Sequence, residues 1–204
     1  MKYYLILFLL LLFGMNTIAQ EDDLIYGEEI AMKRKEIASN ALVNLRNGTL
    51  LVRLNTSSKQ LELLQKMGLT EKLEEVKKEQ QNENKSIVEA FQNQLTFTKQ
   101  VYYFYSEKTP EVIDGRFIGI LLDTNLNPIK ESINIDYFLI ADFNRTENLG
   151  IPALVIYDSS LNQMPPPFPY FTRTYESLPI FNRGHDRTVE LFNEKLFFEY
   201  NKPN

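Results

Sequence analysis

The sequence predicts a single α/β domain, in which helices pack on a mixed sheet of about five strands. Two observations predict this class. Segments with helical spacing of apolar residues lie near the start, after the first strand and at the end of the chain. Short runs of Leu, Ile, Val, Tyr and Phe lie between them, bounded by Gly, Pro and Asn, as is typical of strands. We find no internal repeat in the 204 residues and expect one domain. An α+β arrangement of the same elements is the alternative.

The first helix is predicted over residues 24–45, where apolar residues recur at helical spacing. Asn47 and Gly48 are suited to a left-handed cap at its end. Residues 49–54 (TLLVRL) follow as a strand. Their nearly continuous run of Leu and Val indicates a strand that is covered on both faces.

Two helices are predicted next. Ser57 and Gln60 form a capping-box pattern before a short helix that Gly68 ends, and a longer helix spans residues 71–95. The middle of the longer helix, residues 75–86 (EVKKEQQNENKS), is almost wholly polar. This segment is either a solvated stretch of helix or a charged arm for a partner.

The second half of the chain is richer in strands. The predicted strands are residues 101–106, 117–123, 136–143 and 153–158, with one helical turn at 110–115 and a turn at 125–128. If the first two strands of the sheet are parallel, the crossover between them must be right-handed. A last helix is predicted over residues 187–200, with Asp186 as its N-cap.

The N-terminal segment has the pattern of a secretory signal. Lys2 supplies a positive start, residues 3–13 are an apolar run too short to span a bilayer comfortably, and Thr17 and Ala19 occupy the small-residue positions of a cleavage site. We expect a signal peptide (1–19) and one exported α/β domain (20–204), soluble in the periplasm or outside the cell and without a membrane span. The alternative is an uncleaved N-terminal anchor.

Composition excludes several functions. The formal net charge is −5, and an acidic chain is a poor candidate for nucleic acid, whose phosphates require clustered Lys and Arg. The chain has no cysteine, which removes thiol catalysis and thiolate metal sites. Its single histidine, His185, cannot build a site that needs two imidazoles. We therefore expect no metal ligand, no cofactor and no nucleic-acid partner. An all-oxygen Ca²⁺ site is the alternative, although the sequence contains no DxDxDG-type loop.

The segment 162–183 (NQMPPPFPYFTRTYESLPIFNR) is the most unusual in the chain. Its prolines predict an extended connector or sheet edge over residues 165–169, and the chain can continue as an edge strand from Tyr170. The two-residue period of a strand then places Tyr170, Thr172 and Thr174 on one face and Phe171, Arg173 and Tyr175 on the other. Arg173 would lie between two aromatic rings, where a guanidinium can stack.

Two functions are open for this segment. The stack either fastens the connector to the domain, or the edge and the Arg173 surface bind a ligand or partner by carboxylate pairing or strand addition. Residues 182–187 (NRGHDR) then offer the guanidiniums of Arg183 and Arg187 and the imidazole of His185 at a helix N-terminus, a setting suited to anions. A surface loop with paired arginines is the alternative.

Two resemblances add expectations. Residues 150–158 (GIPALVIYD) resemble the Gly-Ile-Pro-Thr segment and following strand of thioredoxin-like domains, in which the proline is cis and the strand leads to a hairpin and a final helix. The resemblance implies a divergent thioredoxin-like core with an insertion near residues 117–143. Because the Cys-x-x-Cys pair is missing, it implies no thiol redox activity. The signal, LRNGTLLVRL and PPPFPYFTRTYESLPIFNR resemble an uncharacterised family of exported proteins from Bacteroidetes-type bacteria, which implies export and no particular activity.

The sequence contains no GxSxG, GxxxxGK[ST], GxGxxG or HExxH motif. We therefore expect a non-catalytic binding or assembly module, whose partner is a protein or a small anionic ligand. The candidate binding residues are Phe171, Arg173, Tyr175, Arg183, His185 and Arg187. The alternative is a cofactor-free hydrolase that uses His185 and a carboxylate, which requires His185 to line a concave pocket beside an acid and a hydroxyl.

Overall fold

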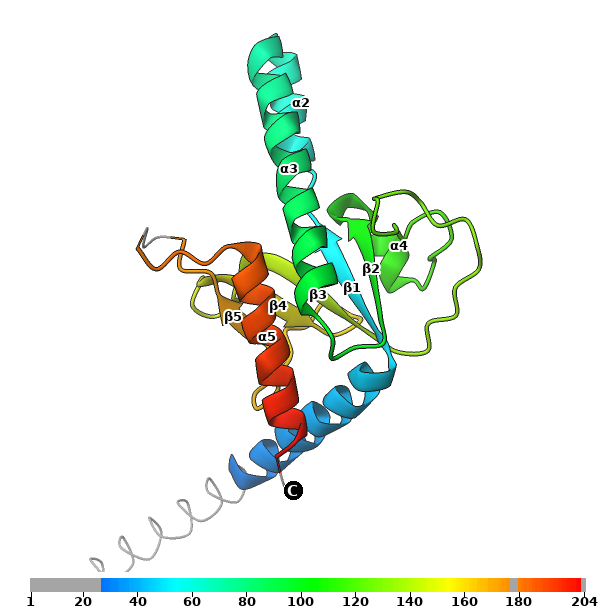
Figure 1. Ribbon diagram of the computed structural model, residues 1–204, viewed down its shortest axis with the longest axis vertical. Coiled ribbons are helices and arrows are strands. Elements are labelled where there is room, and N and C mark those ends of the chain that lie inside the picture. Colours follow the sequence, from blue (N-terminus) through cyan, green and yellow to red (C-terminus); the bar gives the residue numbers. More distant parts are fainter. Residues whose placement is uncertain (1–26, 177–179, 203–204) are drawn as a thin grey trace, which may run out of the picture.

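The computed structural model describes residues 27–176 and 180–202 (Figure 1). The predicted signal peptide, its cleavage site and residues 24–26 of the predicted first helix lie outside these ranges. The elements in chain order are a helix over residues 27–47, β1 (Thr49–Leu54), α2 (Ser58–Lys66), α3 (Thr70–Gln94), β2 (Gln100–Tyr105), a 3-10 turn (Ser106–Lys108), α4 (Thr109–Ile113), β3 (Phe138–Arg145), β4 (Pro152–Tyr157), β5 (Phe171–Arg173) and α5 (His185–Tyr200).

The strands form one five-stranded mixed sheet in the order β2-β1-β3-β4-β5. Strand β1 pairs in parallel with β2 and β3, whereas β3–β4 and β4–β5 are antiparallel. The predicted α/β domain with a mixed sheet of about five strands is therefore confirmed. All residues of β1 except Arg53 are buried, as expected for a strand covered on both faces.

Three helices cover one face of the sheet, and the short helix α4 with irregular chain covers the other. Alternate side chains of β1, including Leu50 and Val52, pack with the helix over residues 27–47, α3 and α5. Figure 1 shows α3 and α5 lying over the same face, where they also contact each other. Leu51 and Ile140 point to the opposite face, which α4 and the connection over residues 114–137 cover.

Residues 117–123, predicted as a strand, form turns instead. Gly119 has a φ of +71°, which breaks the extended run, and only Leu122 forms bridges, with Tyr103 and Pro128. The apolar residues of this segment serve as cover for the sheet, since Leu121 is fully buried against its second face. The predicted turn over residues 125–128 is present, and the carboxylate of Asp123 accepts the N–H groups of Asn125 and Asn127 at 2.8 Å.

Three of the predicted helix-end signals are wrong: the capping box at Ser57, the N-cap at Asp186 and the left-handed cap at Asn47 or Gly48. Ser57 has a left-handed backbone (φ 52°) and makes no side-chain capping bond, and its hydroxyl donates to Gln80. Asp186 is not the N-cap of α5: Gly184 is, and Asp186 lies one residue inside the helix, where its carboxylate accepts both bonds from Gln94 Nε2.

Neither Asn47 nor Gly48 adopts the predicted left-handed cap. Glycine is required at position 48 for a different reason. A Cβ there would lie 2.7 Å from the carbonyl oxygen of Asn44 and 3.0 Å from that of Tyr137. Gly48 therefore allows the end of the first helix to approach the chain that enters β3.

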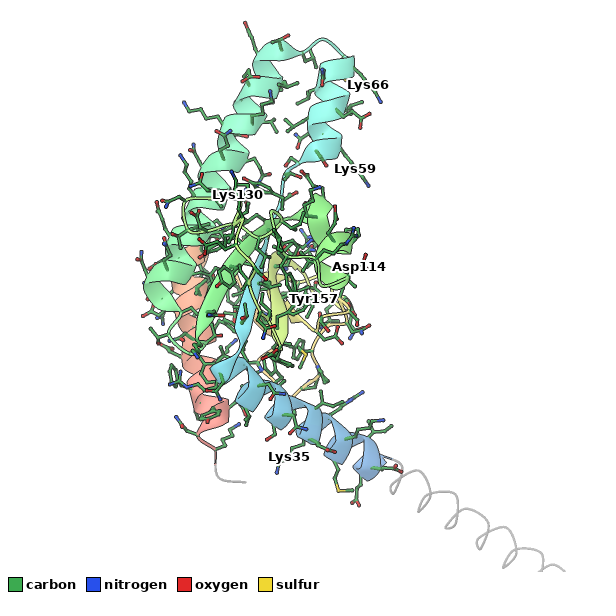
Figure 2. All side chains as sticks on the ribbon, turned by 90° about the vertical axis from the view of Figure 1, so that its right-hand side faces the viewer. Lys35, Lys59, Lys66, Asp114, Lys130 and Tyr157 are labelled. Atoms are coloured by element: carbon green, nitrogen blue, oxygen red, sulfur yellow. The ribbon has the colours of Figure 1, made fainter. Side chains whose placement is uncertain are left out.

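Helices α2 and α3 form a hairpin that projects beyond the sheet (Figure 1). No residue of α2 is buried, and Lys59 and Lys66 point away from it (Figure 2). At the base of the hairpin, Gln80 bonds Ser57 and Asn84, and buried Asn84 donates to the carbonyl of Asn55 at 2.9 Å. The polar segment 75–86 is thus mostly solvated helix. Its role as an arm for a partner stays a prediction.

The C-terminal elements agree in part with the thioredoxin-like resemblance. Strand β4 begins at Pro152 and pairs with β5, after which α5 ends the fold, so the hairpin and final helix are present. The peptide bond before Pro152 is not cis; the cis bond among the described residues is Pro166–Pro167.

Candidate functional site

The proline-rich connector leads to the edge of the sheet. Met164 and Phe168 are buried in the main core and fix its two ends. Between them the chain bends, with the Phe168 N–H bonded to the Pro165 carbonyl at 3.1 Å, so this connector is turned and not fully extended. The predicted edge strand follows as β5, which pairs only with β4 in the sheet.

The predicted faces of β5 are confirmed for Tyr170, Phe171 and Thr172. Tyr170 packs against the core on the helix side, where Thr172 contacts Lys195 of α5, whereas Phe171 packs on the opposite face. Thr174 is also buried. The predicted stacking of Arg173 between two rings is wrong. The cation–π contacts among the described residues do not include Arg173, and Tyr175, with a φ of 58°, lies beyond the end of β5 at Arg173.

The guanidinium of Arg183, and not that of Arg173, lies over the ring of Tyr175. The loop after Tyr175 returns to the strand, where the N–H of Arg183 donates to the carbonyl of Thr174 at 2.7 Å. This contact places the Arg183 guanidinium 4.7 Å from the centre of the Tyr175 ring. The ammonium of Lys195 from α5 lies 5.9 Å from the centre of the Phe171 ring.

Two cations cap the outer edge of β5. Tyr170, Thr172 and Thr174 bond to β4, so the backbone groups of Phe171 and Arg173 face away from the sheet. The carbonyl of Phe171 accepts a hydrogen bond from Lys195 Nζ at 3.1 Å, and that of Arg173 accepts one from Arg183 at 3.4 Å. Cationic side chains on an edge discourage pairing with another strand.

Arg173, Arg183 and Lys195 form what we call the β5 cluster. No carboxylate of the described residues lies within ion-pair distance of any of the three. Burial lowers the pKa of the Lys195 ammonium, and the neighbouring Arg183 charge lowers it further. Lys195 also donates to Thr172 Oγ1 at 3.1 Å. The cluster concentrates positive charge and donors, a chemistry that suits an anion.

His185 and Arg187 contact other partners. His185 Nδ1 lies 3.0 Å from the hydroxyl of Ser86, and its ring meets Phe143 edge-on with centroids 4.7 Å apart. Burial lowers the pKa of His185, and nearby Glu83 and Glu176 oppose this. Arg187 is paired with Glu190 at 2.6 Å. Of the six predicted binding residues, the structure therefore gathers Phe171, Arg173, Tyr175 and Arg183.

Lys195 was missed by the sequence analysis. Its only signal is its place in the last helix, three residues after Phe192 and directly before Leu196, at the border of the apolar face. A lysine at that border is able to reach the neighbouring element while its stem packs on apolar surface.

The sequence analysis also did not predict an ion pair between two neighbouring strands of the sheet. Arg53 and Asp142 are register partners on β1 and β3, and their side chains form an ion pair of 3.0 Å. Asp142 also accepts a bond from Asn144 at 3.1 Å. Burial raises the pKa of Asp142, and the Arg53 charge opposes this. The signal in the sequence is one charged residue within each of two apolar strands, TLLVRL and FLIADF.

The chain matches no protein-family model, no curated protein and no solved structure. Both family resemblances therefore stay predictions. Within residues 27–176 and 180–202, no helix is long and apolar enough to cross a membrane. In the same residues, no three His, Asp or Glu side chains gather as metal ligands would.

Proposed function

We propose that this protein is an exported, non-catalytic binding module, and that its β5 cluster receives the carboxylates of a protein partner or of a small anionic ligand. One observation carries the proposal. The Arg183 charge lies close enough to lower the pKa of Lys195, the backbone carbonyl of Arg173 accepts a bond from Arg183, and no carboxylate of the described residues pairs with any of these three cations in a chain of net charge −5. A bound anion would supply the missing charge.

Carboxylate pairing fits this edge better than strand addition does. An added strand bonds the outward backbone groups of an edge, but Lys195 and Arg183 already occupy the outward carbonyls of Phe171 and Arg173. A carboxylate leaves those bonds in place and uses the remaining donors of the guanidiniums. Arg173 is exposed and, unlike Arg183 and Lys195, makes no cation–π contact with a ring of the described residues, so its side chain is the one best placed to bind a ligand.

The test compares two peptides on the full chain. A fluorescein-labelled peptide of about ten glutamates is titrated by anisotropy beside one of equal length made of glutamines. The glutamate peptide is expected to bind more tightly, and the difference to shrink as salt rises. Arg173→Ala is expected to weaken it about tenfold or more, since a hydrogen bond to a charged group contributes about 1.5–3 kcal/mol.

Arg187→Ala is the matched control, because Arg187 is also an exposed arginine but is already paired with Glu190 and Glu194. It is expected to leave peptide binding within about twofold. Both variants are expected to melt as the parent does. Equal binding of the two peptides, or equal losses in the two variants, would contradict the proposed site.

Export is the second part of the proposal and rests on the pattern of Lys2, residues 3–13, Thr17 and Ala19. Intact mass of protein recovered from the periplasm or medium is expected to match a chain that begins at Gln20. Recovery of the full-length chain from the membrane fraction would instead support an uncleaved anchor.

One observation favours hydrolysis as a second function. The Ser86 hydroxyl lies 3.0 Å from His185 Nδ1, the contact that a base-activated nucleophile requires. However, no carboxylate of the described residues hydrogen-bonds the ring, and neither Ser86 nor His185 lines any of five cavities found over those residues. A fluorophosphonate tests this function: Ser86 Oγ would bond phosphorus, fluoride would leave, and His185 would take the proton. Labelling that Ser86→Ala removes would favour hydrolysis over the binding module.

A further inference from the structure

A cavity of about 520 Å³ lies where the helix over residues 27–47 meets the C-terminal end of α5. Figure 1 shows these two helices converging below the sheet, at the end opposite the projecting hairpin. Ala38 and Leu42 of the first helix, Tyr200 of α5 and Pro167 of the connector contribute apolar walls. The volume lies within the range of about 300–1,000 Å³ that is typical of small-molecule sites.

The walls of this cavity are fixed by packing on the core. The ring of Tyr200 meets Phe97 edge-on with centroids 5.6 Å apart, and Phe97 is fully buried. Pro167 directly precedes Phe168, which is buried in the main core, and Ala38 is itself buried. A site whose walls are already in place loses little freedom when a ligand enters.

The mouth of the cavity is charged, and its charges are unequal. Lys35 and Lys202 lie at the mouth together with Glu199. Glu199 pairs with Lys202 at 2.7 and 2.8 Å, which neutralises that lysine. The ion pairs found among the described residues do not include Lys35, which projects from the first helix (Figure 2). One positive charge therefore remains beside an apolar interior.

We propose that this cavity binds a small amphiphile with an apolar body and a single anionic head, of the class of a medium-chain carboxylate. The body contacts Leu42, Pro167 and Tyr200, where apolar area leaves water. The head pairs with Lys35, the one lining cation that is not paired with a carboxylate of the described residues. The cavity shares no residue with the β5 cluster, so its occupation does not depend on that site.

The probes are decanoate and its uncharged analogue decanol, which have the same body and differ in the head. Each is titrated by calorimetry into the full chain. Decanoate is expected to bind at one saturable site and decanol at least about tenfold more weakly. Ser39→Trp is the blocking variant, because Ser39 lines the cavity but is exposed, so a larger side chain fills the space without entering the core. It is expected to abolish saturable binding.

Lys35→Glu is expected to weaken decanoate about tenfold and to leave decanol unchanged. Lys33→Glu is the matched control, since it makes the same charge change on an exposed residue of the same helix that does not line the cavity. The inference is overturned if the parent shows no saturable decanoate binding, if Ser39→Trp binds as the parent does, or if the two lysine variants lose equally. Equal binding of decanol and decanoate would contradict the proposal that the ligand has an anionic head. Should Ser39→Trp fail to fold, the two lysine variants decide.

Discussion

The Nδ1 atom of His185 lies 3.0 Å from the Oγ atom of Ser86, and this contact joins the first residue of α5 to α3. The same ring packs edge-on against Phe143 of β3. A protonated imidazole is penalised in this place because burial removes water from it, and burial is the largest cause that lowers the pKa of His185. Glu83 and Glu176 lie near enough to oppose part of that shift.

This contact predicts a loss of stability in mild acid. The pKa of His185 lies below its ordinary value of 6.5 in the folded chain, so the unfolded chain binds the proton more tightly. The contribution of His185 to the free energy of unfolding is therefore complete above pH 6.5 and is lost as the pH falls below that value and through the folded pKa. Denaturant unfolding at pH 7.5 and 5.5 measures it. His185→Gln is expected to reduce the difference between the two pH values. An unchanged difference would show that other groups cause it.

A second prediction concerns the ion pair between Arg53 and Asp142. The Asp142 side chain is 11% exposed, whereas the Arg53 side chain is 28% exposed. Asp142→Ala leaves the guanidinium without its partner. It is expected to lower the free energy of unfolding by about 2–3 kcal/mol, less than the about 3–5 kcal/mol typical of fully buried pairs, because water reaches part of Arg53. Denaturant unfolding measures the loss.

Asp114→Ala is the matched control for this loss. Asp114 pairs with Arg116 at 2.9 Å, but both side chains are more than half exposed, so a change below about 1 kcal/mol is expected. The double variant Arg53→Met/Asp142→Leu is expected to recover most of the stability, since apolar side chains of similar volume need no partner. A double variant as unstable as Asp142→Ala would show that the pair itself is required.

A third prediction concerns the base of the helical hairpin. Asn84→Ala removes the donor to the Asn55 carbonyl, which is expected to cost about 1–2 kcal/mol locally. Because no residue of α2 is buried, its amides are expected to exchange with deuterium faster, while amides of the sheet keep their protection. Asn82→Ala, at an exposed position of the same helix, is expected to change neither. Unchanged exchange in α2 after Asn84→Ala would mean that this network does not hold the hairpin.

Periodicity identified most of the fold because it reports burial. The apolar runs at residues 101–106 and 153–158 became β2 and β4, since each had a strand to pair with. The run at residues 117–123 is also mainly apolar, but Gly119 turns it and its side chains cover the sheet. Local sequence does not distinguish an apolar segment that is buried as a strand of the sheet from one that is buried as a loop packed on the face of the sheet. The structure of residues 117–123 was therefore predicted wrongly.

The candidate site was predicted less well, because cation contacts depend on tertiary geometry. The two-residue period placed Phe171 and Thr172 on the correct faces of β5. It could not show that Tyr175 leaves the strand, nor that a loop returns Arg183 to its ring. Lys195 comes from α5 and lies 24 residues from Phe171 in sequence, and no local pattern relates it to β5.

The last prediction tests the junction between the first helix and β1. Position 48 does not need glycine for a left-handed backbone. It needs glycine because a Cβ there would lie 2.7 Å from the Asn44 carbonyl oxygen. That oxygen belongs to the backbone, as does the Tyr137 carbonyl on the other side at 3.0 Å, so neither yields as a flexible side chain would. Gly48→Ala is expected to cost about 1–3 kcal/mol through overpacking. For a domain of this size, that corresponds to roughly 2–4 °C in Tm for each kcal/mol.

Gly27→Ala is the control, because nothing lies within 4 Å of its Cβ position, and it is expected to leave Tm unchanged or slightly raised. A Gly48→Ala variant that melts with the parent would show that the junction relaxes freely, and the close approach to Tyr137 would then not explain the glycine.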